Sequence, residues 1–234
     1  MSLRLVDHVA ASVVGGVPLE RLLAEWGSQA AQTGPELLRP DWLAWAGQEE
    51  PPGWARLGVQ RLEQPGGGPG PLVVWESWSC EGVRPEVACA VTAGDGWMLA
   101  LAGTPAQAQL LHAVDGVVAA SASTQRAQVS GAAPQRVLRA LQDNGGAQVL
   151  SSVSGLRVVL EVAGVELDAL SPDAVLLPVR VATRPFEHAP GPAPSMAGTA
   201  VPVFPAGDDE VEAARRPVRG GAVGPGHAVG RLPR

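Results

Sequence analysis

Lysine, tyrosine and isoleucine are absent from this 234-residue sequence, so all 17 basic side chains are arginines. The lack of lysine excludes a Schiff base, a lysine general base and the phosphate-binding lysine of a P-loop. The lack of tyrosine excludes mechanisms that need a phenol as proton donor. These absences exclude the enzyme classes that depend on such residues. A sizeable core is still expected, because 46% of the residues are hydrophobic.

Charge is scarce and unevenly distributed, since only 17% of the residues are charged and the formal net charge is −6. Residues 215–234 carry five arginines and no acid, whereas the rest of the chain has 12 arginines and 23 acids, a net charge of −11. An acidic body repels phosphate backbones. The charge pattern therefore argues against nucleic acid as a partner of the body and leaves only the arginine-rich end as a place that could attract it.

Long apolar runs are also missing. No run approaches the roughly 20 residues that span a bilayer. The first residues do not form a charged-then-apolar leader, because Asp7 interrupts a short amphipathic stretch. We therefore expect a cytoplasmic protein without membrane insertion.

Helical patterns dominate the first third of the chain. Apolar residues with helical spacing predict a helix over residues 3–14. A second helix is predicted to begin at Pro18. A third is predicted to carry Trp42 and Trp45, with Asp41 as its cap.

The middle of the chain has the alternation typical of strands. Strands are predicted over residues 72–80, 87–93 and 97–102, joined as an antiparallel meander with a tight turn at residues 94–96. A helix over residues 105–120 is predicted to follow, because Thr104 and Pro105 are typical helix-start residues.

The C-terminal half predicts a helix from Pro134 that ends at residues 144–146. Alternation then predicts a strand over residues 156–162 and another over residues 175–181, which together would form a β-hairpin. Residues 187–234 are rich in proline, glycine and alanine, and we expect a disordered linker or tail there.

The predicted fold class is therefore α+β, with N-terminal helices packed on an antiparallel sheet formed by the meander and the C-terminal β-hairpin. The globular domain is expected to cover residues 1–186. An alternative divides it into subdomains over residues 1–125 and 134–186.

Few residues qualify as catalytic candidates. His112 and Asp115 would share one face of the predicted helix, as an acid/base pair or as a solvated pair. Cys80 and Cys89 flank a turn and would form either a disulfide or two reduced thiols, and Arg84 is the cation nearest to them in sequence. No motif supports a catalytic, cofactor or metal assignment, so none is predicted.

All seven tryptophans lie between Trp26 and Trp97. They would build a core between helices and sheet, or an aromatic binding surface. Trp75 and Trp78 have opposite parity along one predicted strand, so they cannot face the same core. At least one of them is therefore a candidate contact residue.

One stretch carries a family resemblance. Residues 154–167, SGLRVVLEVAGVEL, are followed at residues 170–177 by LSPDAVLL. Together they resemble the start of a SpoA-type domain, which occurs in flagellar switch proteins and in the cytoplasmic ring component of type III secretion systems. Its pattern is a strand, a glycine and then Leu-x-Pro-Gly-Asp-Val-Leu-x-Leu. This chain departs from that pattern at Asp173 and Ala174.

The resemblance implies intertwined units whose strand edges pair between chains. It makes the apolar residues of the two predicted strands candidate interaction residues. These are Leu156, Val158, Leu160, Val162, Val175 and Leu177.

Three functional hypotheses follow. The first, which we adopt, is a non-enzymatic assembly or scaffold component, most specifically a type III secretion cytoplasmic-ring-like subunit in a homo- or hetero-oligomer. The second is a protein- or peptide-binding accessory module that uses Trp75 or Trp78. The third is an enzyme with a His/Asp or Cys site.

Overall fold

The computed structural model describes residues 9–27, 32–63, 69–77, 79–125, 129–171 and 173–183. These residues form five α-helices and a ten-stranded sheet in which every pairing is antiparallel. The predicted α+β class and the antiparallel sheet are confirmed. The predicted tail over residues 187–234 and the candidate Trp78 lie outside the described residues.

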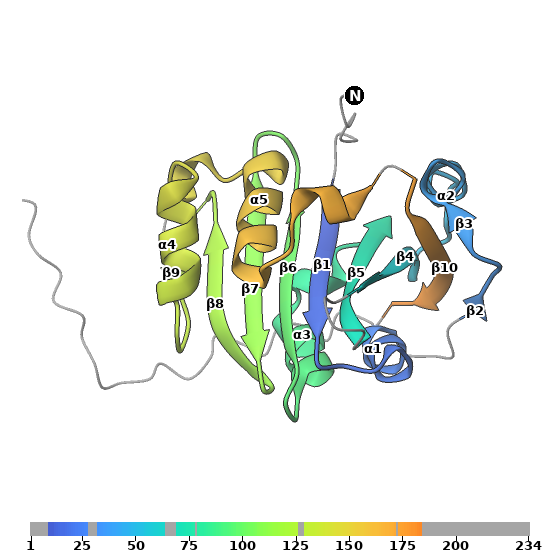
Figure 1. Cartoon of the computed structure of the whole chain (residues 1–234), viewed down its shortest axis with the longest axis horizontal. Helices are drawn as coiled ribbons and strands as arrows, with labels where there is room; N and C mark the ends of the chain where they lie inside the picture. The colour runs from blue at the N-terminus through green and yellow to red at the C-terminus, as the bar shows by residue number, and fades with distance from the viewer. Residues whose placement is uncertain are drawn as a thin grey trace, which may run out of the picture. The chain divides into compact units, whose positions relative to one another are not determined.

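The strand order is β2-β10-β4-β5-β1-β6-β7-β8-β9, and β3 also pairs with β10 (Figure 1). The central strand β1 lies between β5 and β6, with Ser12 opposite Val74 and Ala100. The strands are β1 Val9–Gly15, β2 Gln32–Thr33, β3 Leu37–Leu38, β4 Trp54–Glu63, β5 Pro69–Ser77, β6 Trp97–Gly103, β7 Ala108–Val114, β8 Val117–Ser123, β9 Val129–Ser130 and β10 Val175–Ala182.

Helices cover both faces of the sheet. Residues of α2, α4 and α5 join the core on one face, and residues of α1 and α3 join the core on the other. In Figure 1, α4 and α5 lie in front of the strands and α3 lies behind them. The helices are α1 Leu19–Trp26, α2 Arg39–Ala46, α3 Pro85–Thr92, α4 Gln135–Asp143 and α5 Ser152–Ala163, and the 3₁₀ turns are η1 Glu81–Val83, η2 Ala147–Val149 and η3 Leu167–Leu170.

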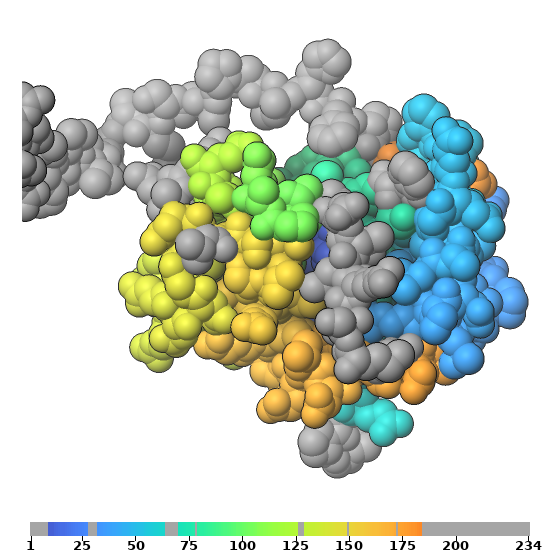
Figure 2. Space-filling model, turned by 90° about the horizontal axis from the view of Figure 1, so that it is seen from above, coloured from blue at the N-terminus to red at the C-terminus, as the bar shows by residue number. Residues whose placement is uncertain are grey.

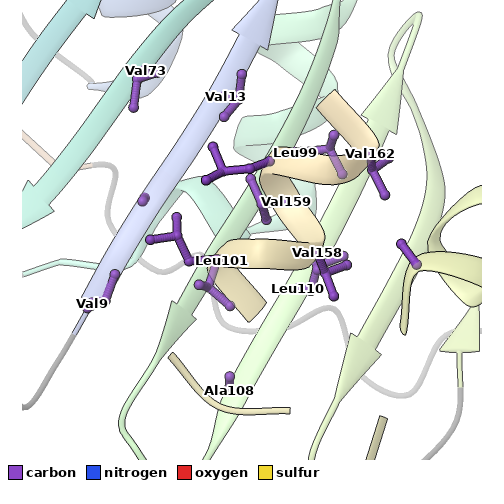
Figure 3. Packing of buried hydrophobic residues seen from close by; sticks show 14 of the residues in the cluster. Val9, Val13, Val73, Leu99, Leu101, Ala108, Leu110, Val158, Val159 and Val162 are labelled. Carbon is purple, nitrogen blue, oxygen red and sulfur yellow. The ribbon is translucent and has the colours of Figure 1, made fainter. Parts of the chain in front are cut away.

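The larger core lies under α5. Val158, Val159 and Val162 of this helix belong to one buried cluster with Leu99 and Leu101 of β6, as Figure 3 shows. Burial of this apolar area is the main stabilising term for the fold. Because α5 also packs on α4, most of its circumference is covered.

The prediction of a helix over residues 3–14 is wrong where the structure describes the chain, because residues 9–15 form β1. Every residue of this strand is buried. A strand covered by helices on both faces loses the apolar–polar alternation and becomes a continuous apolar run, which resembles a buried helix in sequence.

The helix predicted over residues 105–120 is also wrong. The segment forms the β7–β8 hairpin, in which Asp115 and Gly116 form the two-residue turn, with φ of 51° and 77°. A two-residue turn with positive φ at both positions has the type I′ form that Asp-Gly favours. The Asp115-Gly116 dipeptide is therefore the sequence signal that would have predicted a hairpin here.

The meander predicted over residues 72–102 is wrong as well. Residues 87–93 were expected as its middle strand, but residues 85–92 form α3, with Pro85 at the helix start. The strand β5 pairs instead with β1 and β4. Long-range pairing of the N-terminal segment therefore replaces the expected local one.

The strand predicted over residues 156–162 is helix α5, so the expected C-terminal β-hairpin is wrong. Ser151 caps this helix in a capping box with Ser154, and Gly164, in the left-handed region with φ of 68°, ends it. Seven of the twelve residues of α5 are buried, and the exposed residues Val153, Arg157 and Glu161 follow one another at intervals of four, so the polar face is narrow. A spacing of four also fits one face of a strand, which is why the segment alternates in sequence.

Six predicted elements are confirmed: α1 after Pro18, α2, α4, the strands β5 and β6 at the two ends of the expected meander, and the strand β10 over residues 175–182. The predicted cap of α2 is wrong. Leu38 occupies the N-cap position, whereas Asp41 lies in the first turn. An acid there still favours the helix dipole.

Candidate functional site

The structure buries most of the predicted interaction residues. The four residues of α5 that were expected on a strand face lie in the core: Leu156, Val158, Leu160 and Val162. Trp75 is only 8% exposed. Leu177 is half-buried, whereas Val175 is 48% exposed. Val175 is therefore the best-exposed contact candidate among those that the structure describes.

Val175 belongs to an exposed apolar pair. The strands β3 and β10 place it opposite Leu38, which is 51% exposed. Residues opposite each other on antiparallel strands project on the same side and contact each other. Two other exposed apolar residues occur in the same segments, Leu43 in α2 and Leu167 in η3. We name residues 36–43 and the described part of residues 166–175 the acidic–apolar corner.

Arg39 joins the elements of this corner. Its backbone N–H donates to the carbonyl of Ala174 over 2.9 Å, and its Nη1 donates to the carbonyl of Leu170, also over 2.9 Å. The guanidinium lies 4.2 Å from the centroid of the Trp75 ring. Burial lowers the pKa of Arg39. The corner is thus fixed by one buried cation that links α2 to η3 and to the entry of β10.

Exposed carboxylates occur in the same two segments as the apolar residues of the corner. Five acids are exposed in the two segments: Glu36, Asp41, Glu166, Asp168 and Asp173. Arg39 is the one basic residue among the same described positions, and it is buried. The corner therefore presents apolar side chains within negative charge. In Figure 2, orange atoms of the segment after α5 lie next to blue atoms of the α2 segment.

A second cluster consists of tryptophan and arginine side chains at the C-terminal end of α2 and on strands β4 and β10. Arg180 lies over the Trp54 ring at 4.0 Å and Arg56 lies over the Trp45 ring at 4.7 Å. Both guanidinium groups donate to Glu50, whose side chain is only 2% exposed. We name these five residues the tryptophan–arginine cluster.

Glu50 holds this cluster together. Burial alone would raise the pKa of Glu50, but hydrogen bonds from Arg180 and Arg56 outweigh burial and hold the pKa below its ordinary value. The ionised carboxylate therefore connects the turn after α2 to β4 and β10. The rings of Trp45 and Trp54 stay partly exposed beside the two cations.

A third cluster of buried acids lies where β5 leads into η1. Glu76 accepts hydrogen bonds from Ser79 Oγ at 2.7 Å and from the backbone N–H groups of Glu81 and Gly82 at 2.8 and 3.0 Å. Burial raises the pKa of Glu76. Burial also raises the pKa of Glu81 to about 6, although Arg84 pairs with it at 2.7 Å. These contacts cap η1 and orient α3.

The cysteines next to this cluster are not activated. Cys80 is exposed and Cys89 is partly buried, and both are unpaired thiols, so the disulfide alternative is not the state seen in the structure. Burial raises the pKa of Cys80, and the charges of Glu76 and Glu81 raise it further. Burial also raises the pKa of Cys89. A nucleophilic cysteine needs the opposite shift.

His112 and Asp115 do not form the predicted pair on a helix face. His112 lies within β7, and Asp115 lies in the following turn. Burial lowers the pKa of His112, and the nearby Arg136 lowers it further, so the imidazole is neutral at pH 7. Within the described ranges, no group of three or more His, Cys, Asp or Glu side chains is placed to hold a metal ion.

Both edges of the sheet are covered in the part of the chain that the structure describes. The outer edge of β10 pairs with β2 and β3, and Gly34 donates to the carbonyl of Pro178 at 3.0 Å. At the other edge, β9 and two further backbone hydrogen bonds cover β8. The strand-edge pairing that the resemblance implies therefore has little backbone available along β10.

None of the helices in the described ranges has the length and apolar character that crossing a membrane requires. Comparisons of the chain with protein families, with curated proteins and with solved structures find no match.

Sequence reasoning missed Leu38, Leu43 and Leu167. An available signal was that these apolar residues occur in two short segments containing five acids, a mixture that is unfavourable for a core and suits an exposed surface.

Proposed function

We propose that this protein is a non-enzymatic assembly component that binds a protein partner through the acidic–apolar corner. The main support for this proposal is the exposed pair of Leu38 and Val175, which lie opposite each other on β3 and β10. Clustered exposed apolar side chains are typical of protein interaction sites. The fold unites two segments that are more than 120 residues apart in sequence and anchors them through Arg39.

A type III secretion ring-like subunit is the most specific form of this proposal. Its support is the sequence pattern around β10, which includes Val175 and Leu177. The first strand of that pattern corresponds to helix α5, so the mode of assembly differs from the intertwined strands that the resemblance implies. Side-chain contacts at the corner would replace strand pairing.

The test compares two full-length variants. Leu38→Asp combined with Val175→Asp introduces two negative charges at the exposed pair, and Val117→Asp introduces one at an exposed valine of β8 outside the corner. Tagged proteins are purified from the native host, bound proteins are quantified by mass spectrometry, and oligomeric state is measured by light scattering. We expect the amount of one specific partner that co-purifies with the corner variant to be at least about tenfold lower than with the unmodified protein.

Circular dichroism and thermal melting establish that both variants fold. The proposal is wrong if the folded corner variant keeps every partner and the same oligomeric state as the unmodified protein. A selective loss in the Val117→Asp variant would likewise assign binding to another surface.

A peptide-binding module that uses exposed tryptophans is the second candidate. Trp45 and Trp54 favour it, because both rings are partly exposed beside arginines, and Trp and Arg are enriched in binding hot spots. Replacing Trp54 with alanine tests this alternative. Loss of a bound partner without loss of folding supports it, whereas unfolding assigns the ring to stability.

A further inference from the structure

The charges of the acidic–apolar corner restrict the chemistry of its partner. Five exposed carboxylates and one buried arginine give residues 36–43 and 166–175 a formal net charge of −4. The same two segments contain the exposed pair of Leu38 and Val175, with Glu36 and Asp173 each two residues away in sequence. A complementary surface must supply cations at its rim and apolar side chains at its centre.

Building on the proposed function, we infer that the corner docks a basic amphipathic helix of a partner protein. Its apolar residues, three or four positions apart, would cover Leu38 and Val175, and its arginines or lysines would lie against the acids at the rim. An extended peptide suits the corner less well, because β2 and β3 already occupy the outer edge of β10. A helix needs no backbone partners, so it is the better occupant.

Other occupants fit these observations less well. A second copy of this chain docked through the same corner would place two acidic surfaces against each other, because a two-fold contact is self-complementary. A nucleic acid would be repelled by the carboxylates. Within the described residues, no grouping of acids is arranged as a metal site. The apolar pair also needs an apolar ligand, which an ion does not provide.

The test measures binding of synthetic 18-residue peptides to the full-length protein by fluorescence anisotropy. One peptide has leucines at helical spacing with arginines elsewhere. A second contains the same residues in scrambled order, and a third replaces each arginine with glutamate. We expect the first to bind at least about tenfold more tightly than either of the others. We also expect its affinity to fall as sodium chloride rises from about 50 to 300 mM.

Two matched triple variants locate the site. The corner variant carries Asp41→Asn, Asp168→Asn and Asp173→Asn, all at exposed positions. The control variant removes three exposed acids elsewhere, by Glu20→Gln, Asp115→Asn and Asp143→Asn. We expect the corner variant to weaken binding of the basic amphipathic peptide about tenfold and the control variant to change it less than about twofold.

Equal binding of the scrambled peptide would overturn the inference, because general charge attraction would then explain the affinity. Equal weakening by both triple variants would overturn it too. These failures are distinguishable from failure of the proposed function. If the Leu38→Asp and Val175→Asp protein loses a host partner but no basic peptide binds, the corner is an interface with a different partner chemistry.

Discussion

Replacing Glu81 with glutamine tests the buried acid cluster by its effect on the pH dependence of stability. Glu81 is only 4% exposed, and its pKa in the folded protein is about 6, compared with an ordinary value of 4.5. At a pH below the ordinary pKa, the carboxyl of Glu81 is protonated in both the folded and the unfolded chain. Between the two values, the folded chain keeps a proton that the unfolded chain has lost, so the free energy of unfolding falls as pH rises.

The size of this effect follows from the shift in pKa. A difference of about 1.5 units corresponds to about 2 kcal/mol of stability, present below pH 4.5 and lost by about pH 7. Glutamine does not titrate. The Glu81→Gln protein should therefore lose about 2 kcal/mol less stability than the unmodified protein over this pH range. Burial raises the pKa of Glu76 in the unmodified protein as well, and Glu76 keeps its hydrogen bonds from Ser79 and from the backbone when Glu81 is replaced.

Urea unfolding followed by circular dichroism at pH 4.5, 5.5, 6.5 and 7.5 provides the measurement. Glu20→Gln is the control, since it removes an exposed carboxylate of α1 and leaves the cluster intact. Parallel stability curves for the unmodified and Glu81→Gln proteins would refute the reasoning. The native carboxyl would then titrate like an exposed one.

Four further predictions concern packing, charge and thiol chemistry. Val158→Ala should lower the free energy of unfolding by about 2 kcal/mol, because this side chain of α5 is fully buried in the core, whereas Val153→Ala at an exposed position of the same helix should change it by less than about 0.5 kcal/mol, both by urea titration. Gly58→Ala should cost about 1–3 kcal/mol in the same assay, since the added Cβ would lie 2.5 Å from the Trp42 ring. Glu50→Gln should cost about 2–3 kcal/mol at pH 7, and the cost should shrink as pH falls below 4, because the lowered pKa of Glu50 makes its stabilisation disappear on protonation. Iodoacetamide at pH 7 should label Cys80 more slowly than free cysteine, whereas faster labelling, read by mass spectrometry, would contradict the raised thiol pKa.

The candidate interaction surface could be predicted only in part. Val175 was predicted from the family resemblance, and it is exposed in the structure. Leu156 and Val158 came from the same pattern but are buried. Alternation along this short segment could not distinguish a strand from a helix, because Arg157 and Glu161 lie four residues apart, a spacing that fits one face of either element.

Elements whose ends carry local signals could be predicted without knowledge of the fold. Pro18 precedes α1, Pro134 precedes α4, and Gly145 and Gly146 follow α4 with positive φ. Such residues act through their own backbone preferences, so their effect does not depend on distant contacts. Composition likewise determined the acidic character of the body.

Elements that are buried on both sides depend on long-range contacts that local sequence does not reveal. Residues 9–15 became a strand because β5 and β6 flank them and helices cover both sheet faces. The acidic–apolar corner likewise exists only because β3 pairs with β10 across the chain. Long-range packing and strand pairing override local propensity when they bury more apolar area and form more backbone hydrogen bonds than the local alternative would.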